Sequence, residues 1–405
     1  MYIYKAGVVG AGTMGAEIAQ VISYSGLPVV LKDVSQEFVD KGIQKIHEIY
    51  KRRVDKGKMS AADMKSKMNL IKPSTNYDDF KDVDIVVEAV TEKMEIKKKI
   101  FKELDQICPE GTILATNTSS LSISEIGSET KRPPKVIGLH FFFPAHIMKL
   151  VEVIPGLATA EETVDDVTSF SESLRKIPVR VNECAGFLVN RLLMPYLNEA
   201  AYCLQEGSAT MREIDQAAVD FGMPMGPFTL VDNLGLDVCE EVVKILLESY
   251  GDRMRPAELW KRFYDVKLYG KKSEAGFYNY QGTDNQADKL VEDLKKEFSK
   301  KTSKFSIERI VFPMVNEAAY CVQEHVSKAS DIDIAMRAGV GFPEGKGGIL
   351  AYADKVGLDN VLTKLESFNR EHGSRFWPCP LLRRLVGAKF LGVKSKKGFF
   401  EYSAV

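Results

Sequence analysis

The sequence predicts an N-terminal α/β domain followed by two tandem all-α domains. In the first third of the chain, short apolar runs of strand length alternate with segments of helical spacing. A glycine-rich loop follows the first of these runs. In the last two thirds a long helical segment occurs twice, which indicates an internal duplication. The length of 405 residues is sufficient for two or three domains.

The glycine-rich loop lies between a short apolar strand at residues 3–9 and a helix at 16–25, and a second strand at 29–31 leads to Asp33. Strand, glycine loop, helix, strand and acid form the fingerprint of a Rossmann-like dinucleotide-binding domain. The first glycine makes the tight turn, the second lets a pyrophosphate approach the backbone, and the third lets helix and strand pack closely. The helix N-terminus faces the phosphate charge. The residues expected to bind the cofactor here are Gly10, Gly12, Thr13, Met14 and Gly15.

Asp33 indicates which cofactor this loop binds. It follows Gly12 by twenty-one residues, where a carboxylate binds the adenosine ribose hydroxyls and repels a 2′-phosphate. NAD is therefore favoured over NADP, although Lys32 directly precedes the acid. The alternative is a glycine-rich strand–helix turn that binds no ligand.

Residues 36–72 have no turn-rich break and are expected to form two helices. Ten Lys and Arg residues lie between Lys41 and Lys72, against three acids, so this segment carries seven excess positive charges in a chain of net charge −1. Charge runs are usually solvated helix faces. The alternative interpretation is a surface that binds a phosphorylated carrier such as coenzyme A.

Two further strands, at 84–87 and 112–115, each end in a polar cluster. Strand ends in such a sheet face the cofactor crevice, where hydroxyl and amide groups supply contacts to a nicotinamide and a substrate. The alternative is an N-cap for the next short helix, made by Ser120 or Ser122. Residues 179–181 are expected to form the last strand of this domain. The two clusters are Glu88-Ala89-Val90-Thr91-Glu92 and Thr116-Asn117-Thr118-Ser119-Ser120.

The stretch 136–155, VIGLHFFFPAHIMKLVEVIP, is expected to form two buried strands with a turn at Pro144. Its second apolar run contains one carboxylate, Glu152, and burying an unpaired charge is costly. His140, twelve residues upstream, is the natural partner across the turn. An imidazole held by a buried carboxylate has a fixed tautomer and a raised proton affinity, as a general base for an alcohol proton requires. The alternative is a core histidine beside a helix-capping glutamate.

The helical part of the chain begins near residues 182–186 and contains a repeat. The segment RLLMPYLNEAAYCLQE at 191–206 aligns without gaps with RIVFPMVNEAAYCVQE at 309–324. The residue before the repeat differs, because Asn190 in the first copy is replaced by Glu308 in the second. If Asn190 contacts the substrate, only the first copy has kept a site.

We therefore expect three domains. Residues 1–183 form an NAD-binding Rossmann-like domain, and residues 184–283 form the first helical domain. Residues 284–405 contain a linker and the second, duplicated helical domain, and the polar segment 281–304 is expected to be the linker. Because one chain supplies both copies, we favour a monomer over a homodimer.

Composition argues against several other classes of protein. An apolar content of 45% and a charged content of 27% are ordinary for a soluble protein, and the near-zero net charge does not suggest a nucleic-acid partner. No uninterrupted apolar run approaches the ~18–20 residues of a membrane helix. Neither end of the sequence resembles a targeting signal. The six scattered cysteines have no metal-ligand spacing, which is typical of a reducing compartment, so we expect a cytoplasmic protein without a metal site.

Over essentially its whole length, the sequence resembles the NAD-dependent 3-hydroxyacyl-CoA dehydrogenase family. Five motifs carry the resemblance in the family's order: GAGTMGAEIAQ, VVEAVTEKMEIKK, ATNTSSL, GLHFFFPAHIMKLVEVIP and GFLVNRLLMPYLNEA. The doubled helical domain and the PAH after the histidine resemble the dehydrogenase part of multifunctional β-oxidation proteins, without their enoyl-CoA hydratase domain. The resemblance implies oxidation of (S)-3-hydroxyacyl-CoA to 3-oxoacyl-CoA, with NAD as cofactor and an acyl-CoA as substrate.

The resemblance also implies roles for individual residues. His140 matches the catalytic base and Glu152 its orienting carboxylate, while Ser119 and Asn190 match residues that hold the substrate oxygen and help to position the nicotinamide. Phe143 departs from the family pattern, where asparagine or serine is usual, so a side-chain hydrogen bond to the acyl-CoA is lost or moved. The implied cofactor contacts, besides the glycine loop, are Asp33, Ala89, Val90, Glu92, Lys97, Asn117 and Ser119.

Two other functions fit parts of this pattern. A related branch oxidises sugar acids such as L-gulonate, and the basic segment and FFFPAH argue against it. Some lens crystallins of the superfamily are NAD-binding structural proteins. The joint presence of His140, Glu152, Ser119 and Asn190 argues against a non-catalytic protein of that kind.

Overall fold

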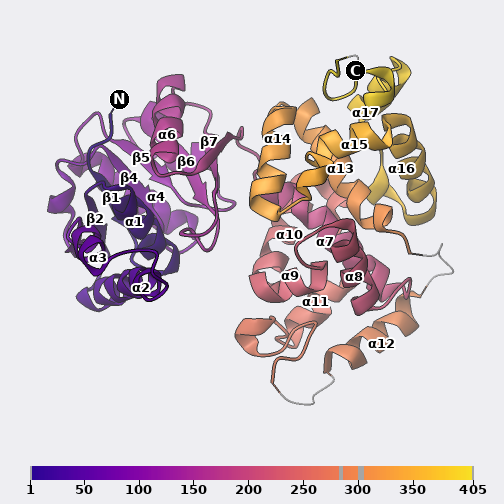
Figure 1. Ribbon diagram of the computed structural model, residues 1–405, viewed down its shortest axis with the longest axis horizontal. Helices are drawn as coiled ribbons and strands as arrows, with labels where there is room; N and C mark the ends of the chain where they lie inside the picture. Colours follow the sequence, from indigo (N-terminus) through magenta and orange to yellow (C-terminus); the bar gives the residue numbers. More distant parts are fainter. Residues whose placement is uncertain (1, 282–285, 300–304, 404–405) are drawn as a thin grey trace. The chain divides into compact units, whose positions relative to one another are not determined.

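The chain divides into two compact units, Met1–Phe187 and Leu188–Val405 (Figure 1). The computed structural model describes residues 2–281, 286–299 and 305–403. The first unit combines strands and helices, and the described part of the second is helical apart from isolated bridges. The predicted order, an α/β domain followed by a helical region, is therefore confirmed.

The first unit is built on one sheet, whose described strands lie in the order β3-β2-β1-β4-β5-β6-β7-β8. Neighbouring strands are parallel except for β6 and β7, which are antiparallel. The central strands β1, β4 and β5 are fully buried, as expected for strands covered by helices on both faces. The strands are β1 (Ala6–Val9), β2 (Val29–Lys32), β3 (Ile71–Ser74), β4 (Ile85–Glu88), β5 (Ile113–Thr116), β6 (Val136–Phe141), β7 (Leu150–Pro155) and β8 (Ile177–Arg180).

The strand order determines where a ligand can bind. The chain adds β2 and β3 on one side of β1 and then crosses to β4 on the other side. In open α/β sheets, ligands bind at such a reversal, outside the carboxyl ends of the strands. The loops that follow β1, β4 and β5 therefore define the expected crevice, and β6 brings the histidine motif to the same edge.

One strand was missed by the sequence prediction. Residues 71 and 72 were expected to end the second helix of the 36–72 segment, but residues 71–74 form β3, which pairs in parallel with β2. The strand alternates in burial imperfectly, with Lys72 and Pro73 both exposed. A proline within a strand is tolerated at the edge of a sheet, where one side makes no ladder. The short, proline-containing sequence gave no period-two signal.

Helices cover the sheet of the first unit. Helix α1 packs on β1, β2 and α2, so the glycine loop and the second strand share one core. The predicted pair of helices in the basic segment is present as α2 and α3. The helices are α1 (Thr13–Ser25), α2 (Gln36–Asp55), α3 (Ala61–Met68), α4 (Met94–Ile107), α5 (Ile123–Gly127) and α6 (Glu161–Ser173).

The second unit is organised around two long helices, α7 and α13, which pack against each other and contain the two copies of the repeated segment. Shorter helices surround them (Figure 1). The helices are α7 (Val189–Gln205), α8 (Met211–Phe221), α9 (Pro227–Leu234), α10 (Leu236–Tyr250), α11 (Glu258–Asp265), α12 (Gln286–Phe298), α13 (Ile307–Gln323), α14 (Ala329–Ala335), α15 (Ile349–Val356), α16 (Leu358–His372) and α17 (Pro380–Gly387).

The segment predicted as a polar linker, 281–304, contains a helix. Helix α12 lies within it, buries Val291 and Leu294, and packs against α7 and α11. The two apolar residues lie three apart, about one turn of a helix. An apolar face this small, between many charged residues, was too weak a signal to predict the helix. Residues 282–285 and 300–304 of the predicted linker lie outside the described residues.

Within the described ranges, none of the helices has the length and apolar content needed to cross a membrane. The same ranges contain no group of three or more His, Cys, Asp or Glu side chains placed to hold a metal ion.

Candidate active site

His140 and Glu152 form the centre of the candidate site. In the antiparallel pair of β6 and β7 the two residues are direct partners, so their side chains project from the same face of the sheet. His140 Nδ1 lies 2.8 Å from Glu152 Oε2, and the two side chains belong to residues that are 5% and 1% exposed. A carboxylate can only accept, so Nδ1 carries the proton and Nε2 keeps a free lone pair. The contact predicted across the turn is therefore present.

Ser119 lies on the other side of the imidazole. Its hydroxyl is 3.2 Å from His140 Nε2, the nitrogen that the Glu152 contact leaves unprotonated. Ser119 comes from the loop after β5, and β5 is the parallel neighbour of β6. Two strands that are adjacent in the sheet thus bring a hydroxyl and an imidazole together at one edge.

Asn117 joins the same two strand ends. Its Oδ1 accepts a hydrogen bond from the backbone amide of Phe141, the residue after His140, at 2.8 Å. The backbone N–H of Asn117 donates to the backbone carbonyl of Glu88 at 2.7 Å, and this bond continues the ladder between β5 and β4. Asn117 therefore fixes the relative position of three strand ends, and its side-chain amino group is left to donate.

The carboxylate of Glu92 holds Ser119 in place by accepting hydrogen bonds from the loop after β5. One carboxylate oxygen accepts from the backbone amide of Ser119 at 2.8 Å and from the hydroxyl of Thr118 at 2.5 Å. The other lies 3.4 Å from the ammonium of Lys97. Of the two N-caps that the alternative interpretation named, Ser122 caps α5 and Ser120 does not.

Lys97, which is expected to contact the cofactor, forms ion pairs with two carboxylates. Its residue is 1% exposed, and its ammonium lies 2.8 and 3.0 Å from the carboxylate oxygens of Glu88, which is fully buried. Glu88 also accepts from the hydroxyl of Thr116 and from the backbone amide of Val90, both at 2.7 Å. The sequence identified the motif that contains Lys97. In the structure its ammonium lies between the carboxylates of Glu88 and Glu92, because the buried charge of Glu88 needs a cation.

The glycine loop fits a pyrophosphate for reasons specific to each glycine. Gly10 has a φ of 102°, and a Cβ on Gly15 would lie 1.7 Å from the carbonyl oxygen of Gly10. A Cβ on Gly12 would meet nothing within 4 Å. Gly12 is also the N-cap of α1 and makes no side-chain cap, so the first backbone amides of α1 remain available to an anion. The open space at Gly12 and the uncapped helix end suit a phosphate group.

Asp33 and Lys32 lie at the end of β2 but point in different directions. Asp33 accepts from the backbone amides of Ala11 and Val34, each at 2.6 Å, which places its carboxylate beside the glycine loop. Lys32 is buried, and its ammonium lies 3.8 Å from the centre of the Tyr77 ring. Burial lowers the pKa of Lys32. The lysine that left the choice of cofactor uncertain is therefore committed to the ring of Tyr77, which is half-buried.

Three residues that the sequence analysis did not identify hold the loop between His140 and Glu152. The backbone amide of Ala145 donates to Glu17 on α1 at 2.6 Å, and its carbonyl accepts from Lys176, which also donates to the carbonyl of Met148 at 2.8 Å. His146 Nδ1 lies 3.3 Å from the same Glu17 carboxylate. The carboxylate of Glu17 thus connects helix α1 to the loop after β6, and Lys176 holds the same loop through two of its carbonyls.

The pKa values of Lys176 and Glu17 at this loop are shifted by burial and by neighbouring groups. Burial lowers the pKa of Lys176 to about 8, although the carboxylate of Glu17 opposes this. For Glu17, burial acts to raise the pKa, but the contacts with His146, Lys45 and the Ala145 amide outweigh it and lower the pKa. The signal that was missed is an acid between Ala16 and Ile18 on the apolar face of the first helix.

Other predicted residues lie outside this cluster. Asn190 is half-buried in the first turn of α7, in the second unit. Phe143 is 62% exposed, and the ammonium of Lys45 lies 6.0 Å from the centre of its ring. Ala89 follows β4 and forms one wall of the glycine turn, because its carbonyl oxygen would be 2.6 Å from a Cβ on Gly10.

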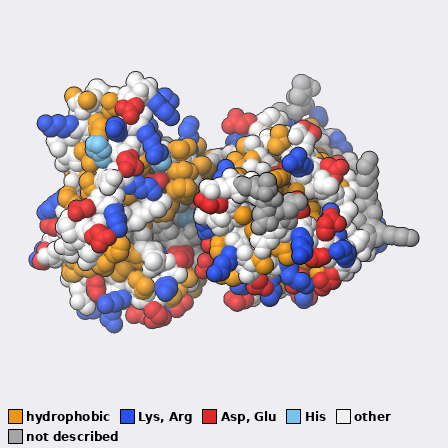
Figure 2. Space-filling view, turned by 90° about the horizontal axis from the view of Figure 1, so that it is seen from below, with side chains coloured by type: hydrophobic (Ala, Val, Ile, Leu, Met, Phe, Trp, Pro, Cys, Tyr) orange, Lys and Arg blue, Asp and Glu red, His pale blue; other side chains and the backbone are white. Residues whose placement is uncertain are grey.

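The basic segment is solvent-exposed over most of its length. Seven of its ten Lys and Arg residues are exposed, and some are neutralised, for example Lys41 by Glu37 and Lys72 by Asp79. Figure 2 views the molecule from the side of α2 and shows basic side chains mixed with acidic and apolar ones on this face of the first unit. Among the described residues, five of these exposed basic side chains make no ion pair: Lys51, Arg52, Lys56, Lys58 and Lys65.

Comparison with known proteins assigns most of the chain to one family. Residues 5–184 match the family described as 3-hydroxyacyl-CoA dehydrogenase, NAD binding domain, and residues 186–280 and 305–402 match its C-terminal domain. The prediction of an NAD-binding domain is therefore confirmed at the level of the family.

Individual relatives extend this match. A peroxisomal fatty acid beta-oxidation multifunctional protein of Arabidopsis thaliana is 37% identical over 396 residues, which cover 94% of this chain and 54% of the relative. The chain spans about half the length of the curated relatives it matches.

Two solved structures are similar along their entire length. A 3-hydroxybutyryl-CoA dehydrogenase of Escherichia coli has a TM-score of 0.87 and 31% identity, covering 96% of this chain and 100% of its own. An (S)-3-hydroxybutyryl-CoA dehydrogenase of Ralstonia eutropha has a TM-score of 0.68 and 41% identity, covering 69% of this chain and 100% of its own. The chain therefore belongs to the 3-hydroxyacyl-CoA dehydrogenase family.

Proposed function

We propose that this protein oxidises (S)-3-hydroxyacyl-CoA to 3-oxoacyl-CoA with NAD, reversibly, as in fatty-acid β-oxidation. The observation that carries the proposal is the arrangement of Glu152, His140 and Ser119 at the carboxyl edge of the sheet, where the strand order reverses. This edge also carries the glycine loop. A base, a hydroxyl and a dinucleotide site at one sheet edge are the parts that an alcohol dehydrogenation requires.

The proposed mechanism assigns a proton transfer to the protein. NAD, when bound, accepts the hydride from carbon 3 of the substrate. His140 Nε2 takes the proton from the 3-hydroxyl, because the Glu152 contact keeps the proton on Nδ1. Glu152 then stabilises the imidazolium, as the buried aspartate does in a hydrolase triad. The hydroxyl of Ser119 donates to the substrate oxygen as it becomes a ketone.

The remaining residues are assigned to binding. The backbone of Gly10–Gly15 and the N-terminus of α1 would hold the pyrophosphate, and Asp33 the adenosine ribose. Glu92 and Asn117 would contact the nicotinamide half, with Lys97 acting through Glu92. Asn190 is assigned to the substrate oxygen on the family resemblance. The unpaired basic side chains of α2 and α3 would attract the phosphates of coenzyme A.

We further propose that the helical region is an internal duplication with a boundary between copies near 284, and that residues 1–183 form the cofactor domain. Buried aspartates support this, because Asp232 accepts from the backbone amides of Phe277 and Tyr278 as Asp354 does from those of Phe399 and Phe400. Since each copy packs on the other through α7 and α13, we propose a monomer, located in the cytoplasm.

The proposal is tested by measuring NADH consumption with acetoacetyl-CoA and longer 3-oxoacyl-CoA substrates, beside NAD reduction with L-gulonate. Turnover of the CoA thioesters without turnover of gulonate supports the assignment. Activity on gulonate alone would identify a sugar-acid dehydrogenase. NADH binding, followed by its fluorescence, without turnover of either substrate would identify a non-catalytic binding protein.

A further inference from the structure

An ion-pair network, buried except at Glu324, connects the two long helices of the second unit. Arg191, in the first turn of α7, is completely buried. Its guanidinium donates from Nε to Glu317 at 2.8 Å and from Nη2 to Glu324 at 2.7 Å, and both acceptors belong to α13 or its C-cap. Arg253 also donates to Glu317, at 3.2 Å. The start of α7 is therefore held by carboxylates supplied from the second copy of the repeat.

The same network occurs in reverse. Arg309, in the first turn of α13, donates from Nε to Glu199 at 2.9 Å and from Nη2 to Glu206 at 2.6 Å, and Arg375 donates to Glu199 at 2.9 Å. Arg309 occupies in the second copy the position of Arg191 in the first, and the acids correspond in the same way. A contact in which residue i meets j while j meets i is the pattern of a two-fold interface.

The two halves of the network differ in what stands next to the arginine. Asn190 precedes Arg191, whereas Glu308 precedes Arg309. The proposed role of Asn190 at the substrate oxygen therefore makes the position of one helix start important for chemistry, while the other has no assigned role. The packing is nearly symmetric, and the function is not.

A proline makes the first turn of each helix depend on this network. Pro195 and Pro313 lie inside α7 and α13, four residues after the arginines. Proline has no amide hydrogen, so the carbonyl oxygens of Arg191 and Arg309 lose the usual helical hydrogen bond. The backbone thus restrains this turn less than elsewhere, and the buried side chain of the arginine supplies the missing restraint.

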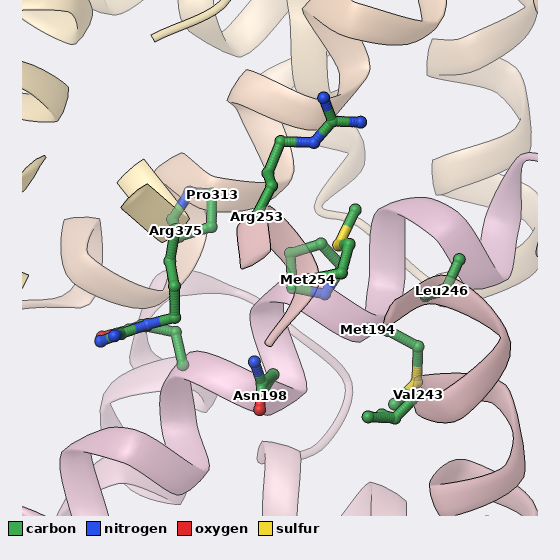
Figure 3. A pocket seen from close by; sticks show the side chains of 10 residues that line it. Met194, Asn198, Val243, Leu246, Arg253, Met254, Pro313 and Arg375 are labelled. Atoms are coloured by element: carbon green, nitrogen blue, oxygen red, sulfur yellow. The ribbon is translucent and has the colours of Figure 1, made fainter. Parts of the chain in front are cut away.

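A small cavity shows that the packing beside the network is incomplete. The cavity has a volume of about 20 Å³, which is enough for one water molecule. Both prolines line it, together with Asn198, Arg253 and Arg375. Figure 3 shows that the two arginines come from different elements and that their side chains extend in different directions. The ion pairs of Arg253 with Glu317 and of Arg375 with Glu199 therefore form part of the packing around this cavity.

We propose that Glu317 and Glu324 are positioning residues for Asn190: they hold Arg191 and thereby fix the turn of α7 that presents Asn190. The second copy then has a catalytic purpose although it carries no site of its own. The inference rests on the proposed function, because it requires Asn190 to contact the substrate oxygen.

The chain contains a matched control for this proposal. Glu317→Gln removes a charge from the network beside Asn190, and Glu199→Gln removes the equivalent charge beside Glu308. Both acids are buried to the same degree and each accepts from two arginines. Glutamine keeps the shape and one acceptor oxygen, so both variants are expected to fold with similar losses in melting temperature.

The measurement is steady-state reduction of acetoacetyl-CoA by NADH. Glu317→Gln is expected to lower kcat about tenfold, because a small misplacement of a catalytic group is costly. Glu199→Gln is expected to stay within about twofold of the wild type, because Glu199 holds Arg309 and lies nine residues beyond Asn190 along α7. Equal losses of kcat, or no loss in either variant, would show that the network serves stability alone and would overturn the proposal.

A double-mutant cycle separates positioning from general damage. In an Asn190→Ala background, Glu317→Gln should cause no further loss of kcat, because the residue through which it acts is gone. A loss that multiplies with that of Asn190→Ala, or an Asn190→Ala variant with normal kcat, would also overturn it. Wild-type turnover of acetoacetyl-CoA separates this test from the proposed function: without turnover both proposals fail, and with turnover only the positioning role is at stake.

Discussion

Glu152 lies directly opposite His140 in the β6–β7 pair, with 2.8 Å between Oε2 and Nδ1. His140→Ala is expected to reduce kcat by about a hundredfold or more, since a general base contributes on the order of 10²–10⁴. The dissociation constant for NADH should change little, because the glycine loop and Asp33 lie on other strands. Equal losses of turnover and NADH affinity would reject the assigned role.

Glu152→Gln tests the tautomer. A glutamine amide can donate to Nδ1 as well as accept from it, so the proton can move to Nε2, where it blocks proton abstraction. We expect kcat to fall by about 10²–10⁴, as loss of the orienting acid does in a triad. Glutamine preserves the packing, so the melting temperature serves as the control. A variant with wild-type kcat would remove Glu152 from the mechanism.

Lys97 and Glu88 provide a test of a buried charge pair. Lys97→Met leaves the carboxylate of Glu88 buried without its cation, which is expected to cost about 3–5 kcal/mol of unfolding free energy. The double variant Glu88→Gln with Lys97→Met should be more stable than Lys97→Met alone, because no unpaired charge remains. Urea denaturation of the three proteins measures the difference. A single variant as stable as the wild type would contradict the pairing.

Gly12 and Gly15 should respond differently to the same added methyl group. Gly15→Ala places a Cβ 1.7 Å from the carbonyl oxygen of Gly10, so we expect loss of both thermal stability and NADH binding. Gly12→Ala meets no protein atom within 4 Å, so the fold should be retained while NADH affinity falls. Melting temperature and NADH fluorescence titration distinguish the two effects. Normal NADH binding by Gly12→Ala would place the phosphate elsewhere.

Lys176 makes stability depend on pH in a defined direction. Its pKa is about 8 in the folded protein and 10.5 when unperturbed, so between these values the unfolded chain binds more protons. Stability contributed through this group therefore rises with pH from about 8 to 10.5. The wild type should gain stability relative to Lys176→Met when urea denaturation is repeated at pH 7 and pH 9.5. A stability difference between the two proteins that is the same at pH 7 and pH 9.5 would show that the pKa of Lys176 is not lowered in the folded protein.

Asp33 and Lys32 predict the cofactor preference. Because Lys32 lies over the Tyr77 ring, the cation nearest to Asp33 in sequence is not available to a 2′-phosphate. We expect a strong preference for NAD, and Asp33→Ala should weaken it by raising KM for NAD more than for NADP. Initial rates with both cofactors measure this. An unchanged ratio would assign cofactor selection to other residues.

Much of the fold was readable from local patterns. The order of strand, glycine loop, helix and acid predicted the dinucleotide-binding domain. The single carboxylate in an apolar run, Glu152, predicted its pairing with His140. The edge strand β3 and helix α12 were missed, since one contains a proline and the other has only two buried apolar residues. In both cases the element is stabilised by its neighbours in space, which local spacing does not record.

The sequence by itself determined the residue types of the candidate site and the repeat in the helical region. The glycine loop, the acid after β2 and the His–Glu pair could be predicted because each follows from the chemistry of a short stretch of sequence. Only the tertiary structure decided how Lys97, Glu17 and Lys176 are used. A buried charge takes its function from whichever partner the packing brings within about 3 Å, and those partners are distant in the chain or on another element.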